Sequence, residues 1–406
     1  MAGIQYLLWI TTRRGLTHRG QVELLEQFGS AERVYFAQRE EFDPLPLNGE
    51  AKRSLCDKSL DSVQRILENC DRLGIFLLSC QDGAYPERLL QLADYPLVLY
   101  GKGRLFRFDE EVAVAMVGAR KCTPYGVKMA GRIALGLSRA GALVVSGLAQ
   151  GIDAASLKGA LQGGGPAVSV LAGGVDVVYP PGNAWLYEDV AARGAILSEN
   201  PPGTPPNGWR FPQRNRILSG LCLGVVAVEA ADGPCGTLIT AHAALDQGRD
   251  VFAVPGLADA PMSGGTNRLI AQGEAKLVRT AGDILCEYQG RFPHKLCRPQ
   301  AMSAEEADQR LDAVPTPPPE PKPEEKQAGQ ELPLAPRGAL EQMGEEQREI
   351  FFLLSEKHLS ADDIVGRTEI PARRVNTALT LLQAGGYLKE LPGRRFAAAV
   401  RFEEQG

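Results

Sequence analysis

Val112-Ala113-Val114-Ala115-Met116-Val117-Gly118-Ala119-Arg120 is the stretch of this sequence that decides its fold. The apolar run stops at a glycine turn, and from Tyr125 onward apolar residues recur at roughly helical spacing. A second apolar run, Leu143-Val144-Val145, ends at another turn, Ser146-Gly147. This succession is typical of a βαβ unit with parallel strands that are covered on both faces. The same alternation continues to about residue 256, so the sequence predicts an α/β fold built on a parallel sheet.

The two glycine turns are expected to lie side by side, because both follow strands of one parallel sheet. The carboxyl edge of such a sheet is where open α/β folds hold ligands. A helix that begins after each turn offers free N–H groups and a positive dipole end to an anion, and Arg120 adds a guanidinium beside them. The stretch therefore predicts an edge that faces phosphate. An ordinary βαβ unit, whose glycines only turn corners, is the alternative.

Further strand ends carry glycine turns, at Gly173-Gly174, Gly233 to Thr237 and Pro255-Gly256. Their repetition favours one broad anion-binding edge over several unrelated corners. None of the turns matches the dinucleotide fingerprint G-x-G-x-x-G, and no P-loop is present. Dinucleotide enzymes and P-loop NTPases are thereby disfavoured.

A second informative stretch is Trp209-Arg210-Phe211-Pro212-Gln213-Arg214-Asn215-Arg216, in which three arginines are interleaved with two aromatic residues. Single-stranded nucleic acid requires this combination, because guanidinium groups bind phosphates and flat rings stack on exposed bases. The alternative is an irregular surface loop whose arginines pair with carboxylates such as Glu199 and Glu229. Beside a glycine-lined edge, we favour the binding role.

The composition of the chain limits which classes of function remain. The chain has 406 residues and a net charge of -5, so any nucleic-acid site must be a local patch. Its eight cysteines form no C-x-x-C pair and do not cluster with the four histidines, which argues against zinc and against a disulfide framework and suits a reducing cytoplasm. No signal peptide or membrane-spanning run is expected, and no metal or other cofactor.

The chain divides into four predicted regions. A small helical domain, similar to SAM or helix-hairpin-helix domains, occupies residues 1–75, and Thr17, Ser30 and Ser59 are the expected caps of three of its helices. The sheet domain occupies residues 76–298. A linker rich in proline and glutamate follows at residues 299–338. Residues 339–400 read as a winged helix-turn-helix whose recognition helix begins near Arg373, Arg374 and Asn376, with duplex DNA or a protein as its ligand.

Several short motifs occur in order along the predicted sheet domain, and together they are highly specific. They are Val117-Gly118-Ala119-Arg120 with Tyr125-Gly126, Ser146 to Asp153, Tyr179-Pro180 with Asn183, Phe211 to Ile217, Gly236 to Ala241, Gly248 to Gly256, and Gly265 to Ile270. On these motifs the chain resembles the DNA-processing protein A family, also called DprA or Smf. The resemblance covers nearly the whole chain and is densest from about Asp82 to Val278.

The resemblance implies an extended Rossmann-like domain that binds and protects incoming single-stranded DNA. It further implies that the protein helps to load the RecA recombinase onto this DNA during natural transformation, forms a homodimer, and catalyses no reaction. Arg120 and the run Arg214-Asn215-Arg216 would contact the DNA. The full set of residues that we expect at the nucleic-acid site is Gly118, Ala119, Arg120, Thr123, Ser146, Gly147, Asn183, Arg210, Phe211, Arg214, Asn215, Arg216, Gly236 and Thr237.

Three positions depart from the family pattern. Ala119 replaces a common serine or threonine and so loses a hydroxyl that would face phosphate. Pro181 stands where some members have a lysine, and Leu157 replaces a frequent histidine. These departures bear on the affinity for DNA more than on family membership.

An enzyme is the competing class, because Gly233 to Thr237 faintly resembles the phosphate loop of Rossmann-like nucleotide phosphoribohydrolases. In those enzymes a catalytic glutamate follows on the helix, whereas here no carboxylate appears before Asp246. His242 lies on that predicted helix beside apolar residues, where we expect it to pack. A transcription factor that acts through the winged helix alone would leave the sheet domain unexplained.

Overall fold

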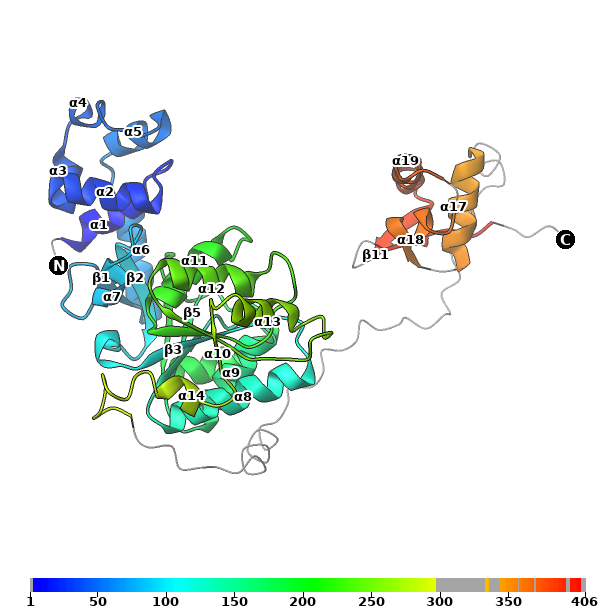
Figure 1. Cartoon of the computed structure of the whole chain (residues 1–406). Helices are drawn as coiled ribbons and strands as arrows, with labels where there is room; N and C mark the ends of the chain where they lie inside the picture. The colour runs from blue at the N-terminus through cyan, green and yellow to red at the C-terminus, as the bar shows by residue number, and fades with distance from the viewer. Residues whose placement is uncertain are drawn as a thin grey trace. The chain divides into compact units, whose positions relative to one another are not determined.

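The computed structural model describes residues 3–296, 333–335, 343–356, 358–368, 370–391 and 395–402 (Figure 1). The chain forms two compact units, Met1–Pro317 and Pro318–Gly406, which are treated separately. Except for residues 333–335, the predicted linker at 299–338 lies outside the described residues. The predicted boundary between residues 1–75 and 76–298 falls inside the first unit and stays a proposal.

Six short helices precede the sheet: α1 (Ile4–Thr11), α2 (His18–Phe28), α3 (Ala31–Phe36), α4 (Arg39–Phe42), α5 (Gly49–Cys56) and α6 (Asp61–Leu73). Thr17 and Ser30 cap α2 and α3 through their side chains, as the sequence predicts. Ser59 was the expected cap of α6, but Leu60 takes the N-cap position, and the Ser59 hydroxyl instead accepts a bond from the Asp61 N–H.

A nine-stranded sheet forms the centre of the first unit. Its strands are β1 (Phe76–Ser79), β2 (Val98–Gly103), β3 (Ala113–Val117), β4 (Leu143–Ser146), β5 (Ala167–Val170), β6 (Ala195–Ser198), β7 (Gly224–Ala227), β8 (Asp250–Ala253) and β9 (Lys276–Leu277). The order across the sheet is β1-β2-β6-β5-β4-β3-β7-β8-β9. From β6 to β9 every neighbouring pair is parallel, whereas β2 pairs antiparallel with both β1 and β6. This arrangement confirms the predicted Rossmann-like sheet.

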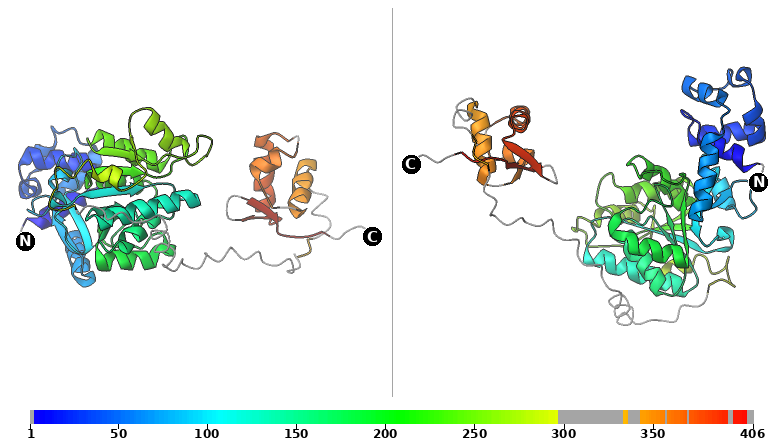
Figure 2. Two further views of the ribbon diagram at one scale, coloured as in Figure 1. Left: turned by 60° about the horizontal axis from the view of Figure 1, so that its bottom comes forward. Right: turned by 180° about the vertical axis from the view of Figure 1, so that it is seen from behind.

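Helices cover both faces of the sheet. Alternate residues of each strand point to opposite sides, and because these residues are apolar, both faces are buried under helices. Val114 and Met116 belong to one apolar cluster, with α8 (Pro124–Arg139), α9 (Ile152–Gln162) and α10 (Ala184–Arg193). Ala113, Ala115 and Val117 belong to the other, with α11 (Arg210–Gly220), α12 (Gly236–Asp246) and α13 (Gly264–Ala271). Figure 2 shows the sheet between these two helix layers. Short helices α7 (Glu87–Leu90), η1 (Phe108–Glu110), η2 (Pro181–Asn183) and α14 (Gly282–Leu285) complete the unit.

The direction of chain progression reverses at β3. From β3 the chain adds β4, β5 and β6 on one side, and then returns to add β7, β8 and β9 on the other. The loops that follow β3 and β7 therefore diverge to opposite faces at neighbouring strand ends. Such a switch point opens a crevice at the carboxyl edge, where doubly wound sheets bind their ligands.

The second unit has the predicted winged-helix arrangement. Its elements are α17 (Glu345–Glu356), β10 (Leu359–Ser360), α18 (Ala361–Val365), α19 (Ala372–Ala384), β11 (Leu388–Leu391) and β12 (Arg395–Ala398), with the three strands in the order β10-β12-β11. Arg373, Arg374 and Asn376 are exposed at the start of α19, and Arg374 pairs with Glu346 at 2.9 Å. Across both units, no helix among the described residues is long and apolar enough to cross a membrane.

Candidate nucleic-acid site

A pocket of about 350 Å³ lies at the switch point of the sheet. The loop after β3 forms one wall, the residues after β7 form another, and the N-terminal parts of α11 and α12 close the sides. Its lining comprises Val117, Gly118, Ala119, Arg120, Ala149, Asp153, Phe211, Arg214, Asn215, Leu218, Ala230, Ala231, Cys235, Gly236, Thr237, Thr240 and Met262. The two stretches singled out in the sequence thus meet in one place.

Arg120 and Phe211 form the rim of this pocket. Arg120 is exposed, and its guanidinium carbon lies 4.8 Å from the centroid of the Phe211 ring. The Phe211 ring in turn meets the ring of Tyr179 edge-on, with 6.0 Å between their centroids. A guanidinium above an aromatic face gains a cation–π interaction and keeps its donors directed outward. The pair therefore offers a charged fork for phosphate next to a flat apolar surface.

Two more aromatic side chains near Phe211 are exposed: Tyr179, which contacts its ring, and Trp209, which lies two residues before it in the chain. Trp209 is 58% exposed and Tyr179 is 42% exposed. The Arg210 guanidinium lies 4.3 Å from the Trp209 ring centroid and also donates to Asn200. We call Tyr179, Trp209 and Phe211 the aromatic ledge. The residues from Arg210 onward form helix α11, so the alternative of an irregular surface loop is wrong.

Arg214 and Arg216 differ from Arg120 in that both are buried, at 6% and 9% exposure. Arg216 pairs with Asp94 at 3.0 Å and with Glu199 at 2.5 Å, so the alternative of carboxylate pairing holds for this residue. Arg214 donates to the carbonyl oxygens of Gly147, at 2.8 Å, and Val170. Burial lowers the pKa of Arg214 to about 10, and the charge of Asp153 opposes this shift. The sequence predicts that both arginines face phosphate, whereas in the structure both guanidinium groups are buried and engaged by carboxylates or main-chain carbonyl oxygens.

The second glycine turn is also satisfied internally. The N–H groups of Gly147 and Ala149 donate to the Asp153 carboxylate, at 3.1 and 3.4 Å. Burial raises the pKa of Asp153, whereas the positive charge of Arg214 and these two hydrogen bonds lower it. The fully buried Ser146 hydroxyl donates to Met116, and the buried Asn183 amide donates to Leu148. The polar groups of these expected site residues are engaged within the protein and support the loop.

Two helix N-termini meet at the switch point, and they differ. At α8, the N–H of Thr123 donates to the Glu229 carboxylate at 2.9 Å, and the Thr123 hydroxyl donates to it at 2.5 Å. Glu229 is only 2% exposed. The Thr123 hydroxyl also accepts the N–H of Gly126, and Pro124 has no N–H, so neither of these first-turn residues of α8 offers a free N–H to phosphate. At α12, Cys235 makes no side-chain cap bond, and the exposed Gly236 lines the pocket, so this N-terminus is open to a ligand.

Eight of the fourteen expected site residues line the pocket: Gly118, Ala119, Arg120, Phe211, Arg214, Asn215, Gly236 and Thr237. Thr123, Ser146, Gly147, Asn183, Arg210 and Arg216 lie outside its lining. Sequence reasoning assigned no role to Asp153 and did not place Glu229 at α8. Each of the two residues carries a signal in the sequence: Asp153 follows a glycine turn, and Glu229 follows an apolar strand.

The His242 side chain is 54% exposed and lies 3.6 Å from Glu274, so the expectation that it packs in the core is wrong. No group of three or more potential metal ligands occurs within the described part of the chain. Leu157 is fully buried in α9, which places this departure from the family pattern in the core.

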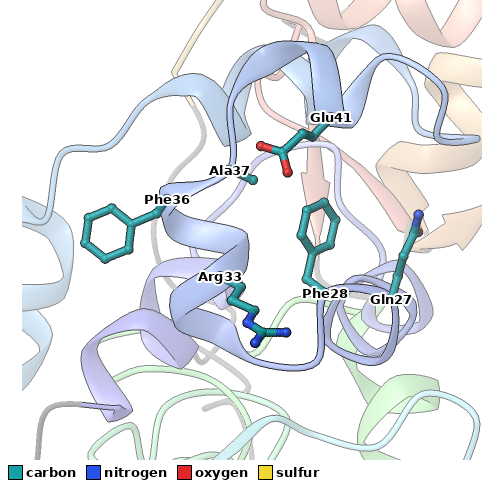
Figure 3. A pocket seen from close by; sticks show the side chains of 6 residues that line it. All are labelled: Gln27, Phe28, Arg33, Phe36, Ala37 and Glu41. Atoms are coloured by element: carbon teal, nitrogen blue, oxygen red, sulfur yellow. The ribbon is translucent and has the colours of Figure 1, made fainter.

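A second pocket, of about 630 Å³, lies among the N-terminal helices (Figure 3). It is lined by Gln27, Phe28, Arg33, Phe36, Ala37 and Glu41. Figure 3 shows Phe36 directed away from the space between Phe28 and Glu41. None of the expected site residues lines this pocket.

Comparisons with known proteins agree on one family. The family model described as DNA recombination-mediator protein A matches residues 76–289, and the model of the DprA winged helix domain matches residues 315–394. The chain is 39% identical over 229 residues to DNA processing protein DprA of Bacillus subtilis, covering 56% of this chain and 76% of the relative. It is 41% identical over 213 residues to DprA of Streptococcus pneumoniae, covering 52% and 73%.

A solved structure supports the same assignment. The X-ray structure of DNA processing protein A from Streptococcus pneumoniae superposes with a TM-score of 0.62 at 33% sequence identity. The match covers 70% of this chain and 97% of that structure. The likeness therefore includes most of the first compact unit.

Proposed function

From the premise that this chain belongs to the DNA recombination-mediator protein A family, we propose that it binds single-stranded DNA at the switch-point pocket. The observation that carries the proposal is the exposed Arg120 guanidinium over Phe211, beside a ledge of exposed aromatic rings. Base–aromatic stacking contributes about 1–3 kcal/mol per base and requires a base face that is not already stacked. Single strands supply such faces, and an intact duplex does not.

The phosphate of the bound strand has two sources of donors in this site. Arg120 provides a planar fork, and the open N-terminus of α12 provides N–H groups at Gly236 and Thr237 with a favourable dipole. Both lie in the lining of one pocket, so a phosphate there can contact both. The protein as a whole is acidic, at a net charge of -5, so this local arrangement must supply the attraction.

The arrangement supports a binding role over the competing enzyme. Asp153 is the one carboxylate in the described lining of the pocket, and it is buried and accepts two backbone N–H bonds. Glu229 lies near the pocket but accepts two bonds from Thr123. A general acid or base needs access to a substrate proton, and both carboxylates are engaged elsewhere. We therefore propose a protein that holds DNA without changing it.

We propose further that the bound strand is delivered to the RecA recombinase in natural transformation, by a cytoplasmic homodimer, with duplex DNA or a protein as ligand of the winged helix. Family membership and the single-strand site support this role. The delay before RecA assembles on a single strand covered by single-strand-binding protein should shorten when this protein is added. Fluorescence of end-labelled DNA follows the assembly. An unchanged delay, with the strand demonstrably bound, would refute the delivery step.

A further inference from the structure

Glu229 holds both ends of the loop that carries Arg120. Its carboxylate accepts hydrogen bonds from the N–H and the hydroxyl of Thr123, and its main-chain oxygen accepts the N–H of Ala119 at 3.0 Å. The segment from Ala119 to Thr123 is therefore anchored at both ends to Glu229. Ala119 is bound to the main-chain oxygen of Glu229, and Thr123 is bound to its carboxylate. Arg120 is the second residue of that segment and projects over Phe211.

The protein is shaped to accept this carboxylate. A Cβ atom at Gly126, in the first turn of α8, would lie 2.3 Å from the carboxyl group of Glu229, so only glycine permits the approach. The helix dipole favours a negative group at this end. Burial, and secondarily the charge of Glu229, raises the pKa of the neighbouring Tyr125 and Cys122 side chains. Glu229 thus places a negative charge next to a site for a polyanion.

We propose that Glu229 is a positioning residue for single-strand binding, which keeps Arg120 over Phe211 by fixing the loop from Ala119 to Thr123. The proposal rests on the proposed function of the pocket. A positioning role and simple electrostatics predict effects of opposite sign. If only its charge mattered, removing Glu229's carboxylate would strengthen binding of a polyanion. If it positions Arg120, removal weakens binding.

Three variants separate these effects. Glu229→Gln removes the charge and keeps the shape, but its amide presents donors where the carboxylate accepts. Thr123→Val removes the hydroxyl without any change in charge, and Thr123→Ser retains the hydroxyl as the matched control. We expect the first two to weaken single-strand binding by about two- to tenfold, which corresponds to the loss of one hydrogen bond. Thr123→Ser should recover most of the binding that Thr123→Val loses.

A double-mutant cycle links the effect to Arg120. In a chain that already carries Arg120→Ala, Thr123→Val should cause no further loss, because the positioned group is gone. Hydrogen exchange without DNA gives an independent measure: the amides from Ala119 to Thr123 should exchange faster in Glu229→Gln. This measurement decides the positioning role even if the unmodified chain fails to bind single strands, which would refute the proposed function alone. Tighter binding by Glu229→Gln, additive losses in the cycle, or unchanged exchange would overturn the proposal.

Discussion

Single-strand binding should weaken by about 10- to 100-fold when Arg120 is replaced by alanine, because a hydrogen bond to a charged group contributes about 1.5–3 kcal/mol. Arg120 is the exposed guanidinium in the pocket lining, and it is held over Phe211 without being buried. The salt dependence should change too. Each phosphate contact with a single strand contributes about 0.7 to the slope of log affinity against log salt, so the slope should fall by roughly that amount.

Two matched variants make this result specific. Arg120→Lys keeps the charge but loses the planar fork that lies on the ring, so it should bind with intermediate affinity. Arg65→Ala removes an exposed arginine from α6, which contributes nothing to the pocket lining, and should leave the affinity unchanged. Fluorescence anisotropy of a labelled oligonucleotide measures all three. An Arg120→Ala chain that binds like the unmodified protein would exclude this residue from the site.

Arg214→Ala should lower the free energy of unfolding by about 3–5 kcal/mol, more than any other substitution proposed for this chain. This is the usual cost when one partner of a buried ion pair is removed and the other charge stays buried and unpaired. The buried guanidinium donates to the carbonyl oxygens of Gly147 and Val170 and lies near the buried Asp153. Truncation leaves two carbonyl groups without this donor and Asp153 without its main positive neighbour. Urea denaturation of the unmodified and variant chains measures the difference.

The control is Arg210→Ala, on the same helix. Arg210 is half-buried, stacks on Trp209 and donates to Asn200, so its loss should cost about 1 kcal/mol or less. If Arg214→Ala left stability within that smaller range but abolished DNA binding, Arg214 would contact the ligand directly, as the sequence first suggested. A large loss of stability instead assigns Arg214 to the support of the Gly147 turn.

The fold was predictable because its signals are local. The apolar run before Gly118, the helical spacing after Tyr125 and the run before Ser146 are each short-range patterns, and each became the expected element. The winged helix-turn-helix of the second unit was predictable for the same reason. A cap is a finer feature, and the predicted cap of α6 failed by one residue because Leu60 adopts the cap position.

The roles of the arginines were not predictable, because they depend on contacts between distant segments. Arg120 closely follows a glycine turn, and Arg214 and Arg216 closely follow two aromatic residues, so the sequence does not separate their roles. Glu199 is named from the sequence only as the less favoured alternative, and Asp94, which also pairs with Arg216, lies far from it in the chain. The placement of Glu229 at Thr123 spans a similar distance and depends on the switch point of the sheet.

The central claim is that the pocket and its ledge accept a single strand and exclude a duplex. The most direct test is the affinity of the full chain for one labelled oligonucleotide, presented as a single strand and as a blunt duplex, across a salt series. The single strand should bind at least about fivefold more tightly, since one stacked base contributes about 1–3 kcal/mol, and its affinity should fall as salt rises. It should also quench Trp209, which is exposed on the ledge, and Trp209→Phe should remove that signal. Equal affinity for the blunt duplex and the single strand would contradict the account.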